Sequence, residues 1–156
     1  NVVDSQGQTA VIIACEEGYI KLLKVLLKHK DIDLNLARSI YGITRTALMI
    51  ASEKGNVKAV KELLKHKNID VNLVCSGGVT ALWIASNKGR TKVVKELLQH
   101  KDIDVNFAPD FGTTALMRAS EKGKVEVVQE LVKHKGINVN MLGKVGQKSQ
   151  GLPHRF

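Results

Sequence analysis

Four histidines recur along the chain and are its best candidates for binding a metal ion. His29, His66, His100 and His134 each stand between a Lys or Gln and a Lys. Zinc requires its nitrogen ligands about 2.0–2.1 Å away, whereas equivalent atoms of stacked helices lie roughly 8–10 Å apart. A row of equivalent histidines therefore does not converge on one ion, and we expect no metal site. We interpret these histidines as helix-end residues, among cations that complement the negative end of the helix dipole.

The carboxylates and thiols do not form a catalytic pattern either. Asp33, Asp70 and Asp104 recur at equivalent positions, and none is paired with a second group that could act with it as acid or base. Cys15 has no histidine nearby in the sequence to activate its thiol. The chain contains neither a Gly-x-x-x-x-Gly-Lys-Ser/Thr loop nor a Gly-x-Ser-x-Gly motif. We therefore expect no enzymatic activity and no cofactor.

An internal repeat positions all of these residues. The segment 80–89 recurs at 46–55, 34 residues earlier, and at 114–123, 34 residues later. A more divergent copy, 9–18, begins 37 residues before the second. Self-similarity at such a period indicates a protein built from stacked structural repeats.

Each copy predicts a short helix, a tight turn and a second helix. In the second copy Thr46 is placed to cap the first helix, and Gly55 to end it in a left-handed conformation. Asn56 is placed to cap the second helix, whose apolar residues share one face: Val57, Val60, Leu63 and Leu64. Helices this short are marginal alone in water, so we expect contacts between neighbouring repeats to stabilise them.

A short extended segment of the Ile-Asp-Val-Asn type follows each second helix, at 32–35, 69–72, 103–106 and 137–140. We expect its aliphatic residues to be buried and its Asp and Asn to start a turn by bonding their own backbone. The loop from Asn35 to Thr46 spans 11 residues, whereas the next two equivalent loops span 8. The second loop is therefore three residues longer than the others.

The repeat resembles the ankyrin repeat, whose signature places a glycine two residues before Thr-Pro-Leu-His-x-Ala and another after the first helix. The matching residues are Gly78, Thr80, Leu82, Ala85 and Gly89, then Gly112, Thr114, Leu116, Ala119 and Gly123. The endings at 70–72 and 104–106 match the family's Asp-Val-Asn. The resemblance implies an all-α fold, an ankyrin-type helix-turn-helix solenoid of four stacked repeats with hairpin-like loops.

This domain is expected to cover residues 1–141, with repeats at about 1–36, 37–73, 74–107 and 108–141. Residues 142–156 are interpreted as a truncated or degenerate fifth repeat or a tail. The chain does not begin with Met, so we expect it to be a piece of a longer protein, with the targeting arm of a larger enzyme as one alternative.

The chain departs from the family signature at two positions. Alanine replaces the proline, and the histidine becomes Ile12, Met49, Trp83 or Met117. We therefore expect the hydrogen bond by which that histidine usually braces the loop to be absent. Trp83 is interpreted as a core residue rather than a binding hot spot.

Composition and charge favour a globular protein with a basic outer face. The 156 residues are 44% hydrophobic and carry 24 Lys and Arg against 15 Asp and Glu, a net charge of +9. Fourteen of these cations are lysines of the second helices and their ends, where glutamates alternate with them. We interpret them as a solvated face. A nucleic-acid or anionic-surface binding module is the alternative, although aromatic residues that could stack on bases are scarce there.

No stretch of about 18 apolar residues is present, so we expect no membrane span. Cys15 occupies a small-residue position and Cys75 an unrelated one, so a disulfide is not expected and a reducing compartment is favoured. We expect an intracellular protein, cytoplasmic or nuclear.

The resemblance implies that the chain binds another protein through the concave groove and loop tips. Positions that vary between repeats are free to specialise for such binding. The predicted partner-binding residues are Arg38, Tyr41, Ile43, Arg45, Glu53, Lys54, Ser76, Val79, Asn87, Lys88, Asp110, Phe111, Thr113, Arg118, Glu121 and Lys122. We expect a monomer, in which replacing Arg45 or Arg118 by alanine weakens partner binding and barely changes stability.

Overall fold

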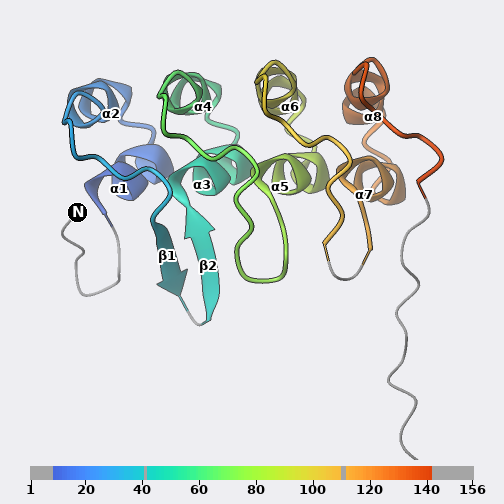
Figure 1. The fold of residues 1–156 in the computed structure, drawn as a ribbon, viewed down its shortest axis with the longest axis horizontal. Helices are drawn as coiled ribbons and strands as arrows, with labels where there is room; N and C mark the ends of the chain where they lie inside the picture. Colours follow the sequence, from blue (N-terminus) through green and yellow to red (C-terminus); the bar gives the residue numbers. More distant parts are fainter. Residues whose placement is uncertain (1–8, 41, 110–111, 142–156) are drawn as a thin grey trace, which may run out of the picture.

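Four helix pairs stack side by side in the computed structural model, which describes residues 9–40, 42–109 and 112–141. The first helices of the pairs are α1 (Ala10–Glu17), α3 (Ala47–Lys54), α5 (Ala81–Lys88) and α7 (Ala115–Glu121). The second helices are α2 (Ile20–Leu26), α4 (Val57–Leu64), α6 (Thr91–Leu98) and α8 (Val125–Val132). They form two rows in Figure 1, with the loops projecting from the side of the first helices. The predicted solenoid is confirmed.

Threonine caps begin all four first helices. The hydroxyl oxygens of Thr9, Thr46, Thr80 and Thr114 accept the backbone N–H three residues later, at 3.2–3.3 Å. This bond satisfies one of the backbone donors that the first turn of a helix leaves unpaired. Gly55 ends α3 with φ of 81°, as predicted.

Asn56 occupies the N-cap position of α4, as predicted, but it does not cap the helix through its side chain. Instead, its Nδ2 donates to the backbone oxygen of Cys15 in the preceding repeat, at 2.8 Å. The residue joins two repeats because the last carbonyls of a helix need donors too, and the stacking brings those of α1 within its reach.

The longer second loop forms a β-hairpin. Strands β1 (Ala37–Ile40) and β2 (Ile43–Thr46) pair antiparallel, with Arg38 opposite Arg45. The turn contains Gly42, whose φ of 77° is left-handed. The three extra residues therefore produce the two-stranded sheet that stands out among the loops in Figure 1.

The core is one continuous layer of small and aliphatic side chains between the two rows of helices. Alanines at the start of the first helices, such as Ala47 and Ala81, are 1% exposed. Cys15, Ser52 and Ser86 share one small-residue position and are each 0% exposed. Small side chains at these positions allow neighbouring helices to approach closely, which fixes the spacing of the loops.

Candidate functional site

A row of asparagine side chains ties each loop to the next. Nδ2 of Asn72 donates to the Asp102 carbonyl at 2.6 Å, and its Oδ1 accepts the Asp104 N–H at 2.8 Å. Asn35 and Asn106 make the same pair of hydrogen bonds to the repeats that follow them. The predicted local turn is also present, because Asp70 Oδ1 accepts the Asn72 N–H at 3.0 Å. These side-chain bonds to backbone therefore join neighbouring loops in addition to the packing of the helices.

The hairpin and the following loop are bonded to each other by two hydroxyl side chains. Ser76 Oγ accepts the Thr44 N–H at 3.1 Å, and Thr44 Oγ1 accepts the Ser76 N–H at 2.8 Å. Cys75 pairs with Val79 in a single bridge within the same loop. Ser76, predicted to bind a partner, thus also fixes the distance between two loop tips.

Ion pairs link the ends of the first helices. Glu16 receives Arg38 from the hairpin at 2.8 Å and Lys54 from α3 at 3.7 Å. Glu53 receives Lys88 from α5 at 3.0 Å. Each ion pair joins residues of two adjacent repeats. The pairs therefore position the charged ends of the first helices relative to one another.

Trp83 and Arg118 join the third repeat to the fourth. The indole Nε1 donates to the Thr113 carbonyl at 2.9 Å, and the Arg118 guanidinium lies 5.2 Å from the centre of the indole ring. Arg118 Nε also donates to Asn87 Oδ1 at 2.8 Å, and its Nη1 to Glu121 at 3.0 Å. The expectation that loop bracing is lost is therefore wrong at this position, because the indole reaches the neighbouring loop and braces it.

This geometry also changes the interpretation of Trp83 and Arg118 themselves. Trp83 is half-buried rather than a full core residue. The Arg118 side chain is 29% exposed and makes cation–π, hydrogen-bond and ion-pair contacts. Its replacement is therefore expected to lower stability as well as to alter the surface, contrary to the expectation from sequence.

The remaining predicted partner-binding residues differ in exposure. Val79 is 5% exposed and belongs to the core, so its assignment as a binding residue is wrong. Ile43 at the hairpin is 54% exposed, and Lys122 is also exposed. Arg45 is half-buried and donates to the Thr44 carbonyl at 2.9 Å. Three predicted residues lie outside the described part of the chain: Tyr41, Asp110 and Phe111.

Two residues of this surface were missed from the sequence. Thr44 gave no signal, since its role depends on a loop 32 residues away. Trp83 did give one: it is the single tryptophan and occupies the position of the family's histidine. Because the family's histidine usually donates a hydrogen bond from this position, the indole N–H of Trp83 could have been predicted to donate one to the neighbouring loop.

The helix-end histidines accept hydrogen bonds from the turns that follow them. Nδ1 of His29, His66, His100 and His134 accepts the backbone N–H two residues later, at 3.2–3.3 Å. Among the residues that the structure describes, no three His, Cys, Asp or Glu side chains come together as a metal site.

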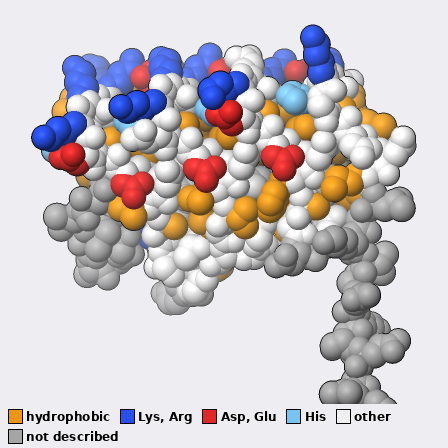
Figure 2. Space-filling model, in the orientation of Figure 1, with side chains coloured by type: hydrophobic (Ala, Val, Ile, Leu, Met, Phe, Trp, Pro, Cys, Tyr) orange, Lys and Arg blue, Asp and Glu red, His pale blue; other side chains and the backbone are white. Residues whose placement is uncertain are grey.

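Lysines and glutamates alternate along the outer face of the second helices, which is the blue band along the upper edge in Figure 2. Lys24 reaches Glu62 of the next repeat at 3.6 Å, and Lys95 reaches Glu130 at 3.5 Å. A hydrogen bond from Lys65, with further attraction from Lys24, lowers the pKa of Glu62. These pairs neutralise part of the basic face.

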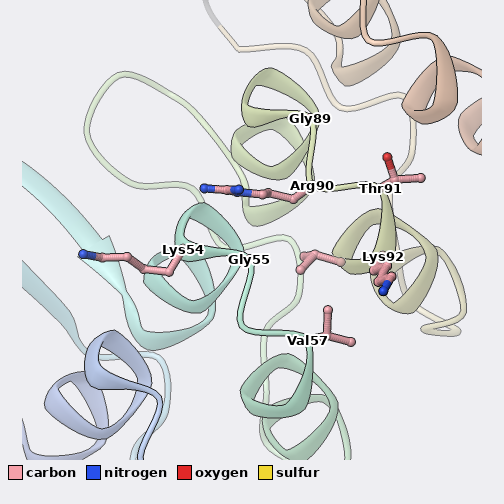
Figure 3. A pocket seen from close by; sticks show the side chains of 8 residues that line it. Lys54, Gly55, Val57, Gly89, Arg90, Thr91 and Lys92 are labelled. Carbon is pink, nitrogen blue, oxygen red and sulfur yellow. The ribbon is translucent and has the colours of Figure 1, made fainter.

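A hollow of about 310 Å³ lies where the helix turns of the second and third repeats meet. Arg90 crosses it above Gly55 and donates from Nε to the Glu53 carbonyl at 3.0 Å. In Figure 3 the side chains of Lys54 and Arg90 extend to the left, whereas Lys92 lies on the right, apart from both. Because these polar groups do not converge, the hollow lacks the arrangement expected of a small-molecule site.

The comparison with family profiles agrees with this architecture. The profile described as "Ankyrin repeats (3 copies)" matches residues 1–75 and 48–142. The chain belongs to the ankyrin repeat family. Members of this family generally serve as protein–protein interaction modules and are typically non-catalytic.

A solved structure described as EF0377, an ankyrin repeat protein, has the same fold. It superimposes with a TM-score of 0.75 at 24% identity, over 86% of this chain. The match covers 66% of the EF0377 chain, slightly under two thirds of its length. Comparison with curated protein sequences finds no significant match. Within the described residues, no helix is long and apolar enough to cross a bilayer.

Proposed function

We propose that this ankyrin repeat chain is a non-catalytic scaffold that binds a partner protein through its loop tips and the ends of its first helices. The observation that carries the proposal is the set of contacts that fix these positions before any partner arrives: Thr44 to Ser76, Glu16 to Arg38, Glu53 to Lys88, and Arg118 to Asn87. A surface ordered in advance loses little conformational freedom on binding, which leaves more of the contact energy for affinity.

The proposed surface combines an apolar tip with charged helix ends. Ile43 supplies exposed apolar area at the hairpin, and Lys88 and Lys122 supply charge further along. Arg118 and Trp83 are residue types enriched at binding hot spots. Of the residues predicted from sequence, those retained and described are Arg38, Ile43, Arg45, Glu53, Lys54, Ser76, Asn87, Lys88, Thr113, Arg118, Glu121 and Lys122. We propose an intracellular setting, cytoplasmic or nuclear, since both cysteines are free thiols.

Affinity isolation from a native lysate, followed by binding measurements on the purified partner, tests this proposal. The variant Ile43→Asp with Lys122→Glu changes one exposed side chain of the hairpin and one at the end of a first helix, and we expect it to lose the partner. The matched control, Lys58→Glu with Lys92→Glu, changes two exposed lysines of the second helices and should retain it. A partner that is lost with the control and kept with the loop variant would refute the proposal.

The second candidate function is binding of a nucleic acid or anionic surface by the outer lysines. Lys21, Lys58 and Lys92 favour it, because they are exposed and form no ion pair within the described residues. The two functions differ in their response to salt. Binding to duplex DNA weakens with a log–log slope of about −0.9 per phosphate contacted, whereas a mixed protein interface is less sensitive.

A further inference from the structure

The ends of the first helices carry a regular pattern of opposite charges. Lys54, at the end of α3, lies 3.7 Å from Glu16 of the preceding repeat. Lys88, at the end of α5, lies 3.0 Å from Glu53 of the preceding repeat. Glu16 and Glu53 occupy equivalent positions, and so do the two lysines. By this pattern, the next lysine of the row, Lys122 in the fourth repeat, requires a carboxylate in the third.

The third repeat lacks that carboxylate. Asn87 occupies the position of Glu16 and Glu53, and it accepts a hydrogen bond from Arg118 Nε at 2.8 Å. Lys122 is exposed and forms no ion pair within the described residues. The lysines at the ends of α3 and α5 are both paired. The charge pattern is therefore interrupted at the junction of the third and fourth repeats.

A second departure from the repeat falls at the same junction. Arg118 replaces the isoleucines at positions 13, 50 and 84, and Lys122, the C-cap residue of α7, follows it by four residues. Residues four apart on a helix are neighbours, and like charges at that spacing are unfavourable. Glu121 pairs with Arg118 at 3.0 Å. Among the described residues, the junction thus combines two adjacent cations with one carboxylate.

Hydrogen-bond donors at this junction remain unused. Arg118 uses Nε for Asn87 and Nη1 for Glu121, whereas its Nη2 makes no hydrogen bond within the described residues. The amide nitrogen of Asn87 also donates none among these residues. The Arg118 guanidinium is held 5.2 Å from the centre of the Trp83 ring, and its side chain is 29% exposed. The guanidinium is therefore held in place and still reached from solvent.

We propose that this junction binds a glutamate or aspartate side chain of the partner protein, with its carboxylate between Lys122 and Arg118. The inference rests on the proposed function and adds the chemistry of one contact to it. The partner's carboxylate supplies the charge that Glu16 and Glu53 supply at the two earlier junctions. Hydrogen bonds from a guanidinium or an ammonium to a carboxylate are stronger than those between neutral groups.

The surroundings favour a protein carboxylate over a nucleic-acid phosphate. Carboxylates fill the equivalent position in the first and second repeats. A nucleic acid carries a negative charge at every nucleotide, so its backbone would also lie against the carboxylates at the neighbouring helix ends, Glu53 and Glu121. A protein segment can instead place one acidic residue at the junction and neutral or basic residues beside those glutamates.

Asn87→Glu tests the inference, because it restores the charge pattern within the chain itself. The new carboxylate should pair with Lys122 and Arg118 and so occupy the proposed site. We expect a chain that is at least as stable in urea unfolding and that has lost affinity for an acidic ligand. Damage to the junction would instead lower stability and affinity together. Val74→Glu is the matched control, since it adds the same charge at an internal loop residue that is 42% exposed.

Isothermal titration calorimetry at low salt, with capped octaglutamate as the probe, measures this affinity. Asn87→Glu and Lys122→Ala should each weaken binding about fivefold, as expected for the loss of an exposed ion pair. Val74→Glu should weaken it less than about twofold. Lys58→Glu with Lys92→Glu removes more positive charge than Asn87→Glu, from the outer face, and should nevertheless weaken binding less.

Several outcomes would overturn the inference. These are equal affinity of octaglutamate for the chain and for Asn87→Glu, octaglutamine binding as tightly as octaglutamate, and a greater loss in the outer-face variant than in Asn87→Glu. Tighter binding of an oligothymidylate of equal length, lost in Asn87→Glu, would assign the junction to nucleic acid and overturn it too. A partner protein that binds the loop side while octaglutamate does not bind would overturn this inference alone and leave the proposed function in place.

Discussion

Replacing Asn72 with alanine tests whether the asparagine row stabilises the solenoid. The substitution removes two hydrogen bonds between the third loop and the following repeat, of 2.6 and 2.8 Å. A hydrogen bond contributes a net 0.5–1.5 kcal/mol, so two contribute about 1–3 kcal/mol. Because the site is partly exposed, water can replace the lost partners, and we expect the lower part of that range, about 1–2 kcal/mol.

Urea unfolding followed by circular dichroism measures this change in the free energy of unfolding. With a denaturant slope of about 1–3 kcal/mol per M, the midpoint should fall by about 0.3–2 M. Asn140→Ala is the matched control, because the same side chain makes no hydrogen bond within the described residues. In dilute solution it should change stability by less than about 0.5 kcal/mol. If both variants lost the same free energy of unfolding, the effect would come from the local conformational preference of asparagine and not from hydrogen bonds between repeats.

Four further perturbations are expected to have measurable effects. Ser86→Ala should raise the free energy of unfolding by about 1 kcal/mol in urea unfolding, because its buried hydroxyl has no hydrogen-bond partner; a loss of stability would contradict this. Gly55→Ala should cost more than Gly123→Ala in the same assay, by about 1 kcal/mol. Both glycines have positive φ, but of the two only Gly55 would place its new Cβ 3.1 Å from a side-chain carbon of Arg90. If both substitutions lowered the free energy of unfolding equally, that contact would not be the cause. Burial raises the pKa of the Cys15 thiol from 9.0 to about 12, so near pH 8 a disulfide reagent should modify Cys75 much faster, and both thiols should react alike in denaturant. Above pH 9 the unfolded thiol loses its proton and the folded one keeps it, so stability should fall by about 1.4 kcal/mol per pH unit until about pH 12; a Cys15→Ala variant that falls equally would refute this cause.

The sequence predicts the elements well where their determinants are local. Thr46 and Gly55 mark the limits of α3 because each acts on backbone within a few residues. The same local reasoning placed Asn56 at the start of α4 but missed its side-chain partner, because the carbonyl it bonds belongs to Cys15, 41 positions earlier. A side chain whose partner lies in the next repeat cannot be assigned until the stacking is known.

The candidate surface was predicted less completely than the fold. Positions that vary between repeats were taken to be exposed. Val79 occupies such a position, but its side chain is buried and only 5% exposed. A repeat can change a core side chain when its neighbours change with it, so variation alone does not establish exposure. Arg118 was correctly singled out as unusual, but its stacking on Trp83 depends on a neighbour 35 residues away.

The single tryptophan gives this protein a built-in optical reporter of one junction. Trp83 touches the fourth repeat through Thr113 and Arg118, and the chain has no second indole to mask its emission. Detachment of the last helix pair should therefore change the fluorescence while most of the helical signal persists. Comparing the two signals during unfolding reveals whether the solenoid frays from this end or melts as a whole.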